Sequence, residues 1–307
     1  MMSGYKEKNV IYSFILPIFN PANTLIQALE ALSNQKYKNI ELIVVDDSIK
    51  SNEELINQFQ TKIKIIKYLK RTNSDGLDGA FNYGIKNANG DVIVMFTDDN
   101  IPDENFLLNI DKHYKNGSDC VIVRSKVINK FSLFGIYQSL YENKNYSKKK
   151  FKPHWSEGFS VKKKVLISVG AYENVGVHGG NDNILSQKIE NQFKVVRDFT
   201  IKMYHYAPSS LNEFYNQQIQ RGSAGPQHDL LFLKRGKPII ILKYILKFIK
   251  FSIIIFSQIF VLIESLYLIR FSEKINLGNF FKIYLCLNLK KIINTYAEIT
   301  TIIKFFK

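Results

Sequence analysis

The sequence has 307 residues, of which 46% are apolar and 13% aromatic, and its formal net charge is +15. This composition excludes a disordered, collagen-like or low-complexity chain, and the length favours two structural units over one. The 2 cysteines, Cys120 and Cys286, exclude a disulfide scaffold and indicate a reducing, cytosolic environment. The polar segment 1–9 lacks the apolar run of a secretory signal, so we expect none.

Strand and helix signals alternate through the first half of the chain. Apolar, β-branched runs predict four strands, over 10–17, 40–45, 63–68 and 91–96. Helical apolar spacing predicts intervening helices over 24–34 and about 77–88. The order β-α-β-α-β-α-β predicts an α/β fold with a mainly parallel sheet, covered on both faces. Ligands should then gather at the carboxyl ends of the strands.

The pattern is looser between residues 115 and 235. It predicts a strand over 120–127, a helix over 132–141, a solvated loop over 143–152, a helix over 181–191, and strands over 193–196 and 199–204. From Pro238 onward the sequence consists of long helical runs. We therefore predict a domain over 1–235 and a separate helical region over 236–307.

Acidic residues follow two of the predicted strands, as Asp46-Asp47-Ser48 and as Thr97-Asp98-Asp99-Asn100. Such carboxylates can accept hydrogen bonds from a base or ribose, or bind a divalent cation that neutralises a diphosphate. They could instead only cap the following helices, but two such pairs, each closing an apolar strand, favour a ligand site. The chain lacks the glycine-rich sequences of dinucleotide oxidoreductases and P-loop enzymes.

Over about residues 10–235 the chain resembles the GT-A-fold nucleotide-sugar glycosyltransferases of family 2. The matching segments are Phe14-Ile15-Leu16-Pro17-Ile18-Phe19-Asn20, Ile43-Val44-Val45-Asp46-Asp47-Ser48, the glycine-rich stretch from Asn73 to Gly90, and Phe96-Thr97-Asp98-Asp99-Asn100. The resemblance implies a Rossmann-like GT-A domain and a metal-dependent, inverting glycosyltransferase that uses Mn²⁺ or Mg²⁺. Two departures stand out: Phe81 occupies a position where Arg is common, and Asn100 replaces the last Asp of a strict Asp-x-Asp motif.

The resemblance also implies roles for residues of the first four strands. Donor contacts fall on Pro17, Phe19 and Asn20, on Asp47, which would read a uracil base, and on Asp98, which would contact the ribose or sugar. Asp99 would bind the metal. Arg71 follows the third strand, where it could contact base or phosphate.

Further roles fall on the second half of the predicted domain. Asp182, in Asn181-Asp182-Asn183, would deprotonate the acceptor hydroxyl, although its position also suits an N-cap of the following helix. His205 would lie near the metal or the diphosphate. Gln218 and Arg221 resemble a Gln-x-x-Arg segment that closes over donor and acceptor. Single His and Gln-x-x-Arg patterns also occur as purely structural features, and this alternative stays open.

The C-terminal region is both apolar and basic. Residues 234–307 contain 13 Lys and Arg against 3 Asp and Glu, a net charge of +10. We predict one long helix over 238–269 and a second over about 279–306. The polar residues of the first helix fall near one line: Lys243, Lys247, Lys250, Ser257, Gln258, Glu264 and Ser265. Three arrangements are open: helices lying in a membrane surface, a span over 251–269, and a soluble hairpin or dimer interface.

The sequence thus predicts an inverting glycosyltransferase at the cytoplasmic face of the cell membrane, peripheral, monotopic or spanning. Its partners would be a nucleotide-sugar donor, which the resemblance implies is a UDP-sugar, and a hydroxyl acceptor on a surface polysaccharide, glycan or lipid-linked molecule. We expect no nucleic-acid partner, and a homo-oligomer is open. The alternatives are a nucleotidyltransferase of similar sheet architecture and an inactive membrane-bound scaffold.

Overall fold

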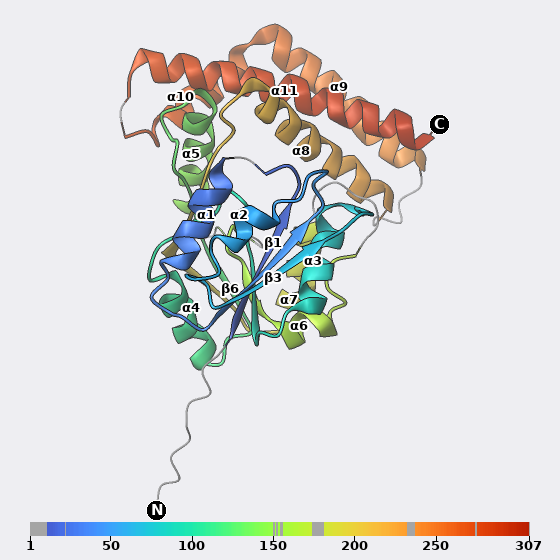
Figure 1. The fold of residues 1–307 in the computed structure, drawn as a ribbon. Helices are drawn as coiled ribbons and strands as arrows, with labels where there is room; N and C mark the ends of the chain where they lie inside the picture. Colours follow the sequence, from blue (N-terminus) through green and yellow to red (C-terminus); the bar gives the residue numbers. More distant parts are fainter. Residues whose placement is uncertain are drawn as a thin grey trace, which may run out of the picture. The chain divides into compact units, whose positions relative to one another are not determined.

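The computed structural model describes residues 11–306 apart from 22, 150, 152, 154–155, 174–180, 232–236 and 274. The chain forms two compact units. The sheet unit comprises Met1–Ser125, Lys152–Asn174 and Asp182–His205, and the helical unit comprises Lys126–Phe151, Val175–Asn181 and Tyr206–Lys307. In chain order the elements are β1 (Tyr12–Ile18), α1 (Thr24–Ser33), β2 (Ile40–Asp46), α2 (Glu53–Asn57), β3 (Ile65–Lys70), α3 (Gly76–Asn87), β4 (Val92–Met95), β5 (Ile101–Pro102), α4 (Phe106–Lys115), β6 (Cys120–Val127), α5 (Leu133–Tyr146), β7 (Ser160–Lys162), α6 (Lys163–Ser168), α7 (Asn181–Glu190), β8 (Val195–His205), α8 (Leu211–Leu231), α9 (Lys237–Ser257), α10 (Ile259–Ile269) and α11 (Leu277–Phe306) (Figure 1).

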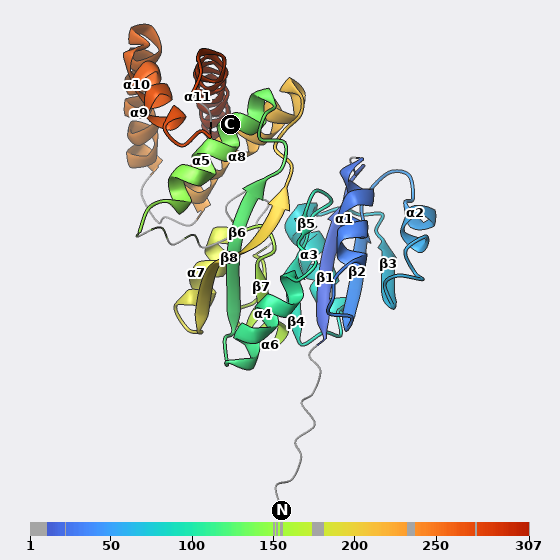
Figure 2. The same cartoon turned by 90° about the vertical axis from the view of Figure 1, so that its left-hand side faces the viewer.

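The sheet has the strand order β3-β2-β1-β4-β7-β6-β8-β5. β1 pairs in parallel with β2 and β4, and β2 pairs in parallel with β3, so these strands run side by side in one direction (Figure 2). β7 is antiparallel to β4 and β6, and β5 is antiparallel to β8. The predicted mainly parallel arrangement is therefore correct for β1–β4 only, and the whole sheet is mixed. Apolar runs predict strands but do not fix the direction in which later strands return to the sheet.

Both faces of the sheet are covered, which explains the continuous apolar strands. Phe14 and Leu16 of β1 pack on one face with Leu29 of α1 and with apolar residues of α4. Ile15 of β1 lies on the opposite face, together with Phe81 of α3 and residues of α6 and α7. The alternation follows from the two-residue period of a strand. All seven residues of β1 and all seven of β2 are buried.

Two predicted boundaries are wrong. The strands expected over 193–196 and 199–204 form one strand, β8, and helix α5 continues to Tyr146 into the expected loop. In β8 the polar residues Arg197 and Asp198 interrupt the apolar pattern, yet they have partners: Arg197 pairs with Glu190 at 2.8 Å and Asp198 with His113 at 2.8 Å. In the sequence alone such a polar stretch indicates the end of a strand, because apolar periodicity contains no information about the partners of its polar residues.

The helical unit is built around its own apolar core. The rings of Phe134 in α5 and Phe214 in α8 stack at 4.4 Å between centroids, and Ile283 and Leu287 of α11 belong to the same core. α8 and α11 approach closely because Gly222 has no side chain: a Cβ there would lie 2.7 Å from the carbonyl oxygen of Asn294. Residues 206–231 thus pack with the C-terminal helices, whereas the domain boundary at 235 stays a prediction.

The single helix predicted over 238–269 is divided into α9 and α10. Gln258 adopts a left-handed conformation, with φ of 53°, and breaks the helix there. Its side-chain oxygen accepts a hydrogen bond from the Tyr284 hydroxyl of α11 at 2.6 Å. The break lets both segments pack against α11. Within the described part of the chain, none of the helices combines the length and the apolarity needed to cross a bilayer.

Several polar residues of α9 and α10 pair with protein partners. Glu264 forms an ion pair with Lys291 at 2.8 Å, and Lys247 forms one with Glu298, both on α11. Lys243 pairs with Asp229 of α8. Large apolar residues of the same helices are exposed instead; on α9 they include Leu242, Ile245, Leu246, Ile249 and Ile253.

Candidate active site at the carboxyl edge of the sheet

The carboxyl ends of β1–β4 meet at one edge of the sheet. Ile18 pairs with Asp46, Asp46 pairs with Lys70, and Ile15 pairs with Met95, so the segments that follow these strands begin close together. The predicted donor residues of the first four strands therefore share one edge. The strand register thus brings these segments together, and their donor contacts stay predictions.

The turn after β1 is fixed to the turn after β2. Pro17 is buried within β1, and Phe19 beyond it is 66% exposed. Asn20 has φ of 49°, a left-handed conformation that Asn adopts more readily than most residues. Its backbone N–H donates to the Ser48 hydroxyl at 2.8 Å. Phe19 and Asn20 thus form a short exposed turn with a defined backbone, directly after the strand that contains the buried Pro17.

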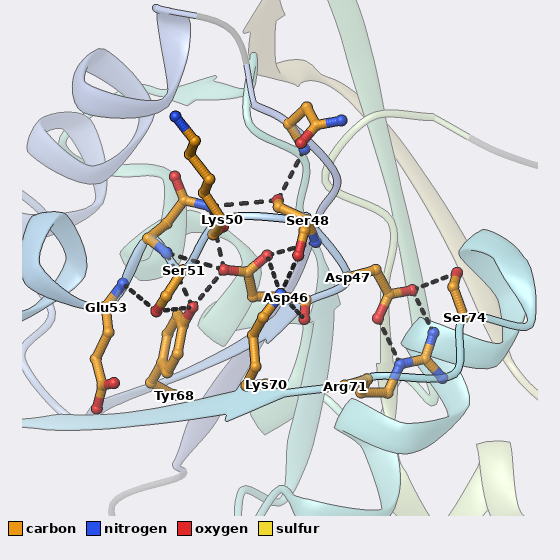
Figure 3. A network of polar contacts seen from close by, with 12 residues as sticks. Asp46, Asp47, Ser48, Lys50, Ser51, Glu53, Tyr68, Lys70, Arg71 and Ser74 are labelled. Carbon is orange, nitrogen blue, oxygen red and sulfur yellow. Dashed lines mark hydrogen bonds and ion pairs between the residues drawn. The ribbon is translucent and has the colours of Figure 1, made fainter.

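Asp46 organises the loop that follows β2 (Figure 3). Its carboxylate accepts hydrogen bonds from the backbone N–H of Ser48 at 2.7 Å, from the backbone N–H of Asn52 at 3.0 Å, and from the Tyr68 hydroxyl. Burial alone would raise the pKa of Asp46, but these hydrogen bonds favour the carboxylate and lower the pKa overall. Asp46 is therefore a structural carboxylate that organises this loop.

Asp47 and Arg71, which the sequence analysis treated separately, form a bidentate ion pair (Figure 3). Arg71 Nε lies 2.6 Å from Oδ1 of Asp47, and Nη2 lies 2.5 Å from Oδ2. Ser74 donates its hydroxyl to Oδ2 of Asp47 at 2.7 Å, and Asp75 accepts from Nη1 of Arg71 at 2.7 Å. The Asp47 carboxylate raises the pKa of Arg71 further. The guanidinium also lies 5.8 Å from the ring centroid of Tyr83.

Ser74 and Asp75 were not predicted as site residues. They lie in the turn before α3, and their sequence pattern is that of an ordinary polar turn. Only the pairing of β2 with β3 brings this turn to Asp47.

Asp99 lies in a second cluster of titratable groups, after β4. Its Oδ1 accepts from the Thr97 hydroxyl at 2.7 Å and from the Asn100 side-chain amide at 3.2 Å. Burial raises the pKa of Asp99; the Thr97 hydrogen bond and His205 oppose this shift, whereas Glu157 and Asp98 add to it. The predicted residues Asp98, Asp99 and His205 are thus brought within electrostatic reach of one another, and Asn100 supports Asp99 instead of acting as a second acid.

Glu157 is the residue of this cluster that sequence reasoning did not assign. Antiparallel β7 returns beside β4, with Ser160 opposite Val94, and this pairing brings the segment before β7 to the carboxyl end of β4. Gly158 has φ of 75°, and a Cβ there would lie 2.7 Å from the Cε atom of Met203.

The residues around Asp99 can be compared with the ligands that a divalent cation needs. Among the described residues, three His, Cys, Asp or Glu side chains do not converge in a geometry that could hold an ion by themselves. Mg²⁺ and Mn²⁺ bound with nucleotides commonly use one or two carboxylates together with the phosphate oxygens. The half-buried Asp99, with Asp98 and His205 nearby, fits this shared kind of site.

Asp182 lies in the first turn of α7, where a negative charge interacts favourably with the helix dipole. Because α7 begins at Asn181, Asp182 is inside the helix and not the N-cap that the alternative proposed. Burial raises the pKa of Tyr172, and the nearby charges of Asp182 and Asp78 raise it further. Asp182 is therefore on the side of the sheet that carries α3.

The glycine-rich stretch before β4 serves packing. A Cβ at Gly84 would lie 2.3 Å from Cγ2 of Ile15, so this glycine lets α3 approach β1. Asn82 exchanges two hydrogen bonds with the backbone of Tyr172, at 2.8 and 3.0 Å. Phe81, in place of the common Arg, stacks on Tyr172 with 5.6 Å between centroids. Phe81 thus belongs to the core.

Gln218 and Arg221 lie on α8 in the helical unit. Gln218 is fully buried, donates to the Gln217 side chain at 3.1 Å, and has an Oε1 atom without a hydrogen-bond partner in the described structure. Arg221 is exposed and acts electrostatically on Tyr137. Their predicted donor contacts stay predictions.

Comparisons with known proteins agree with this geometry. The family model described as "Glycosyl transferase family 2" matches residues 13–176, more than half of the chain. The glycosyltransferase GlyG of Streptococcus pneumoniae is 33% identical over 98 residues, which are 32% of this chain and 33% of GlyG. The minor teichoic acid biosynthesis protein GgaB of Bacillus subtilis is 34% identical over 125 residues, which are 38% of this chain and 14% of GgaB. The match therefore spans a third or less of each relative's length.

Solved structures share the fold. TarS 1–349 of S. aureus, in complex with UDP, has a TM-score of 0.54 at 15% identity, over 94% of this chain and 90% of that one. The mannosyltransferase PcManGT of Pyrobaculum calidifontis, in complex with GDP-Man and Mn²⁺, has a TM-score of 0.58 at 14% identity, over 96% and 74%. Together with the acidic strand ends at one sheet edge, the family match leads to a plain conclusion: this chain belongs to glycosyl transferase family 2.

Proposed function

We propose that the protein transfers a sugar from a nucleotide-diphosphate donor to a hydroxyl acceptor, with inversion at the anomeric carbon. The observation that carries this proposal is the meeting of Asp47 and the Asp98–Asp99 pair at the carboxyl edge of β1–β4, within the segment that matches family 2. The UDP and UDP-GlcNAc complexes of TarS, which shares the fold, favour a UDP-sugar as donor.

The Asp47–Arg71 pair supports a role in reading the base. Each carboxylate oxygen can accept two hydrogen bonds. Oδ1 of Asp47 accepts from Arg71 Nε at 2.6 Å and keeps capacity for a base N–H. The bidentate Arg71 and the Ser74 hydroxyl hold this carboxylate in one orientation, which lowers the entropic cost of binding a base. Asp47 would contact the donor, and Arg71 would position Asp47.

Asp99 and His205 would hold Mn²⁺ or Mg²⁺, with Asp98 contacting the ribose or sugar. When bound, such a cation neutralises the negative charge that develops on the leaving diphosphate. The Thr97 hydroxyl and the Asn100 amide fix the Asp99 carboxylate in the orientation that a shared site requires. The PcManGT complex with Mn²⁺ supports this assignment through its shared fold.

Asp182 would take the proton of the acceptor hydroxyl as that oxygen attacks the anomeric carbon. A single carboxylate on the acceptor side suffices for an inverting reaction, because the proton leaves as the new glycosidic bond forms. The acceptor would be a hydroxyl of a surface polysaccharide, glycan or glycolipid. GgaB, a relative described as a minor teichoic acid biosynthesis protein, supports this class of acceptor.

The helical unit supports a location on the membrane surface. Polar residues of α9 and α10 pair with α8 and α11, whereas Leu242, Leu246 and Ile253 are 56–58% exposed on one face of α9. The exposed face of α9 is thus apolar, whereas the exposed face of a helix in water is polar. Such a helix fits a location in a lipid interface. The net charge of +10 over residues 234–307 favours an anionic surface at the cytoplasmic face of the membrane.

A nucleotide-sugar hydrolysis screen tests the proposed reaction. The full-length protein would be incubated with UDP- and GDP-sugars in the presence of Mn²⁺, Mg²⁺ or excess chelator, and the released nucleoside diphosphate measured. We expect release from one donor class, stimulated by the cation. Asp99→Asn should remove the cation response, whereas Asp103→Asn, the same change at an exposed carboxylate nearby, should keep it. Equal release by wild type and Asp99→Asn would contradict the metal assignment.

A further inference from the structure

The helical unit contains a group of cationic and aromatic side chains. It draws on four helices, and we call it the cationic–aromatic cluster. Its members are Tyr137, Tyr141 and Lys144 of α5, Arg221 of α8, Glu264 and Tyr267 of α10, and Lys290 and Lys291 of α11.

Lys290 occupies the centre of the cluster. Its Nζ donates a hydrogen bond to the Tyr137 hydroxyl at 2.8 Å and lies 4.8 Å from the ring centroid of Tyr141. Lys144 lies 5.3 Å from the ring centroids of both Tyr141 and Tyr267. Aromatic rings attract these ammonium groups without neutralising their charge. The cluster is therefore held together by contacts that leave its positive charge in place.

The charge of the cluster is unbalanced. The charged groups with the largest effect on Lys290 are three cations, namely Arg221, Lys291 and Lys144, and the carboxylate of Glu264. That carboxylate is already paired with Lys291 at 2.8 Å. Burial lowers the pKa of Lys290 to about 8, and the three neighbouring cations lower it too, against the effect of Glu264.

Solvent can reach the cluster. Tyr141 is 38% exposed and Tyr267 is 42% exposed, and both lie beside Lys144. Arg221 is exposed as well, and the side chain of Lys291 keeps 21% of its surface. An anion could therefore enter from the rim formed by the two tyrosines.

We propose that the cationic–aromatic cluster binds a phosphoryl group. Lys290 keeps two further N–H donors beyond its bond to Tyr137, and Lys144, Lys291 and Arg221 supply more. A compact, doubly charged anion matches this excess of positive charge and donors better than a carboxylate does. The phosphoryl group can belong to a soluble phosphorylated molecule or to a lipid headgroup. Apart from Arg221, the cations of the cluster have no proposed role in sugar transfer, and the test below alters only Lys290 and Lys291, so each proposal can fail without the other.

Two probes distinguish these sources in binding measurements on the full-length protein. One is glycerol 3-phosphate, followed by calorimetry. The other is phosphatidylcholine vesicles with and without phosphatidic acid, followed by cosedimentation. The double variant Lys290→Gln/Lys291→Gln should lose roughly tenfold or more in affinity, because hydrogen bonds to charged groups are lost. The matched control Lys250→Gln/Lys304→Gln removes the same charge from exposed positions of α9 and α11 and should change the affinity less than about twofold.

The pH dependence gives a readout that a purely structural role would not produce. Binding should weaken as pH rises through about 8, because Lys290 then loses its proton. Lys290→Arg keeps the charge at all these pH values, so it should bind the probe without this pH step.

The outcomes separate clearly. Affinity for glycerol 3-phosphate that depends on Lys290 and Lys291 supports the proposal with a soluble ligand. Added affinity for phosphatidic acid vesicles alone, with the same dependence, supports it with a lipid headgroup. The proposal is overturned if neither probe binds, if the control double variant loses as much affinity as the cluster variant, or if Lys290→Arg shows the same pH step as wild type.

Discussion

In the sheet unit the apolar side chains of β1 and β2 are enclosed between helices on both faces, and polar groups gather at the strand ends. In the helical unit α9–α11 pair many of their polar side chains with one another and leave Ile, Leu and Phe residues exposed. The two units thus place their apolar surface in opposite ways. Exposed apolar surface of this kind is typical of interaction sites for proteins or membranes, whereas the central strands of the sheet unit are fully enclosed.

The largest expected effect is a loss of turnover when a polar residue of the sheet unit, Asp182, is replaced. Asp182→Asn should lower kcat by on the order of 10²–10⁴-fold while the donor dissociation constant stays near wild type, because a general base acts in the transition state. Asp78→Asn is the matched control, since Asp78 also acts on Tyr172 but has no proposed role in transfer. Steady-state kinetics and donor titration would measure both variants. Analysis of the product should show inversion, and retention would contradict a single-base mechanism.

The next effect compares buried with exposed apolar residues. Phe14→Ala removes a fully buried ring that contacts Phe96 at 5.3 Å, and it should lower the free energy of unfolding by about 3–5 kcal/mol. Leu246→Ala, at a residue that is 58% exposed, should change it by less than about 0.5 kcal/mol. Urea denaturation would compare the two variants. Similar losses would show that α9 is covered by protein in solution.

A third experiment tests what the exposed face of α9 contacts. Replacing Leu242, Leu246 and Ile249 by Gln should weaken binding to anionic vesicles by on the order of tenfold per residue, since apolar burial contributes about 25 cal/mol per Å². Ile167→Gln is the control, because Ile167 is an equally exposed residue of the sheet unit. Flotation at low and high salt should show that salt weakens binding only partly. Wild-type protein that stays unbound but dimerises through this face would point to a second copy as the occupant.

The smallest effect compares hydrogen bonds inside the two units. Tyr68→Phe removes a donor to Asp46, and Tyr284→Phe removes a donor to Gln258; each should cost about 0.5–1.5 kcal/mol at neutral pH. The folded-state pKa of Asp46 is lowered, so its hydrogen bonds stabilise the fold above the unfolded-state pKa, and this stability is lost as pH falls through the folded-state value. The cost of Tyr68→Phe should therefore shrink in acid.

Gln258 does not titrate, so the cost of Tyr284→Phe should not depend on this ionisation. Urea denaturation at neutral and acidic pH would measure both. A cost of Tyr68→Phe that stays constant down to low pH would contradict the assignment of Asp46 as a hydrogen-bonded carboxylate.

Much of the sheet unit could be predicted from the sequence, because its signals are local. The first four strands lie within two residues of their predicted bounds, and Asp47 and Asp99 were found because acidic residues directly follow apolar strands. Ser74 and Glu157 were missed because Ser74 donates to Asp47, 27 residues earlier, and Glu157 acts on Asp99, 58 residues earlier, through strand pairing. Asp75 contacts Arg71, only four residues away, but Arg71 reaches the strand end only by pairing with Asp47. The break at Gln258 was missed because it depends on packing against α11.

The sequence by itself determined the alternation of strands and helices, the acidic strand ends, the family resemblance and the basic, apolar character of the C-terminal region, since each is written in neighbouring residues. The tertiary structure alone decided the antiparallel return of β7 and β8, the pairing of Asp47 with Arg71, the division of the C-terminal helix at Gln258, and the assembly of the cationic–aromatic cluster from four helices. These features arise from contacts between segments far apart along the chain, and hydrophobic periodicity carries no information about which distant segments will meet.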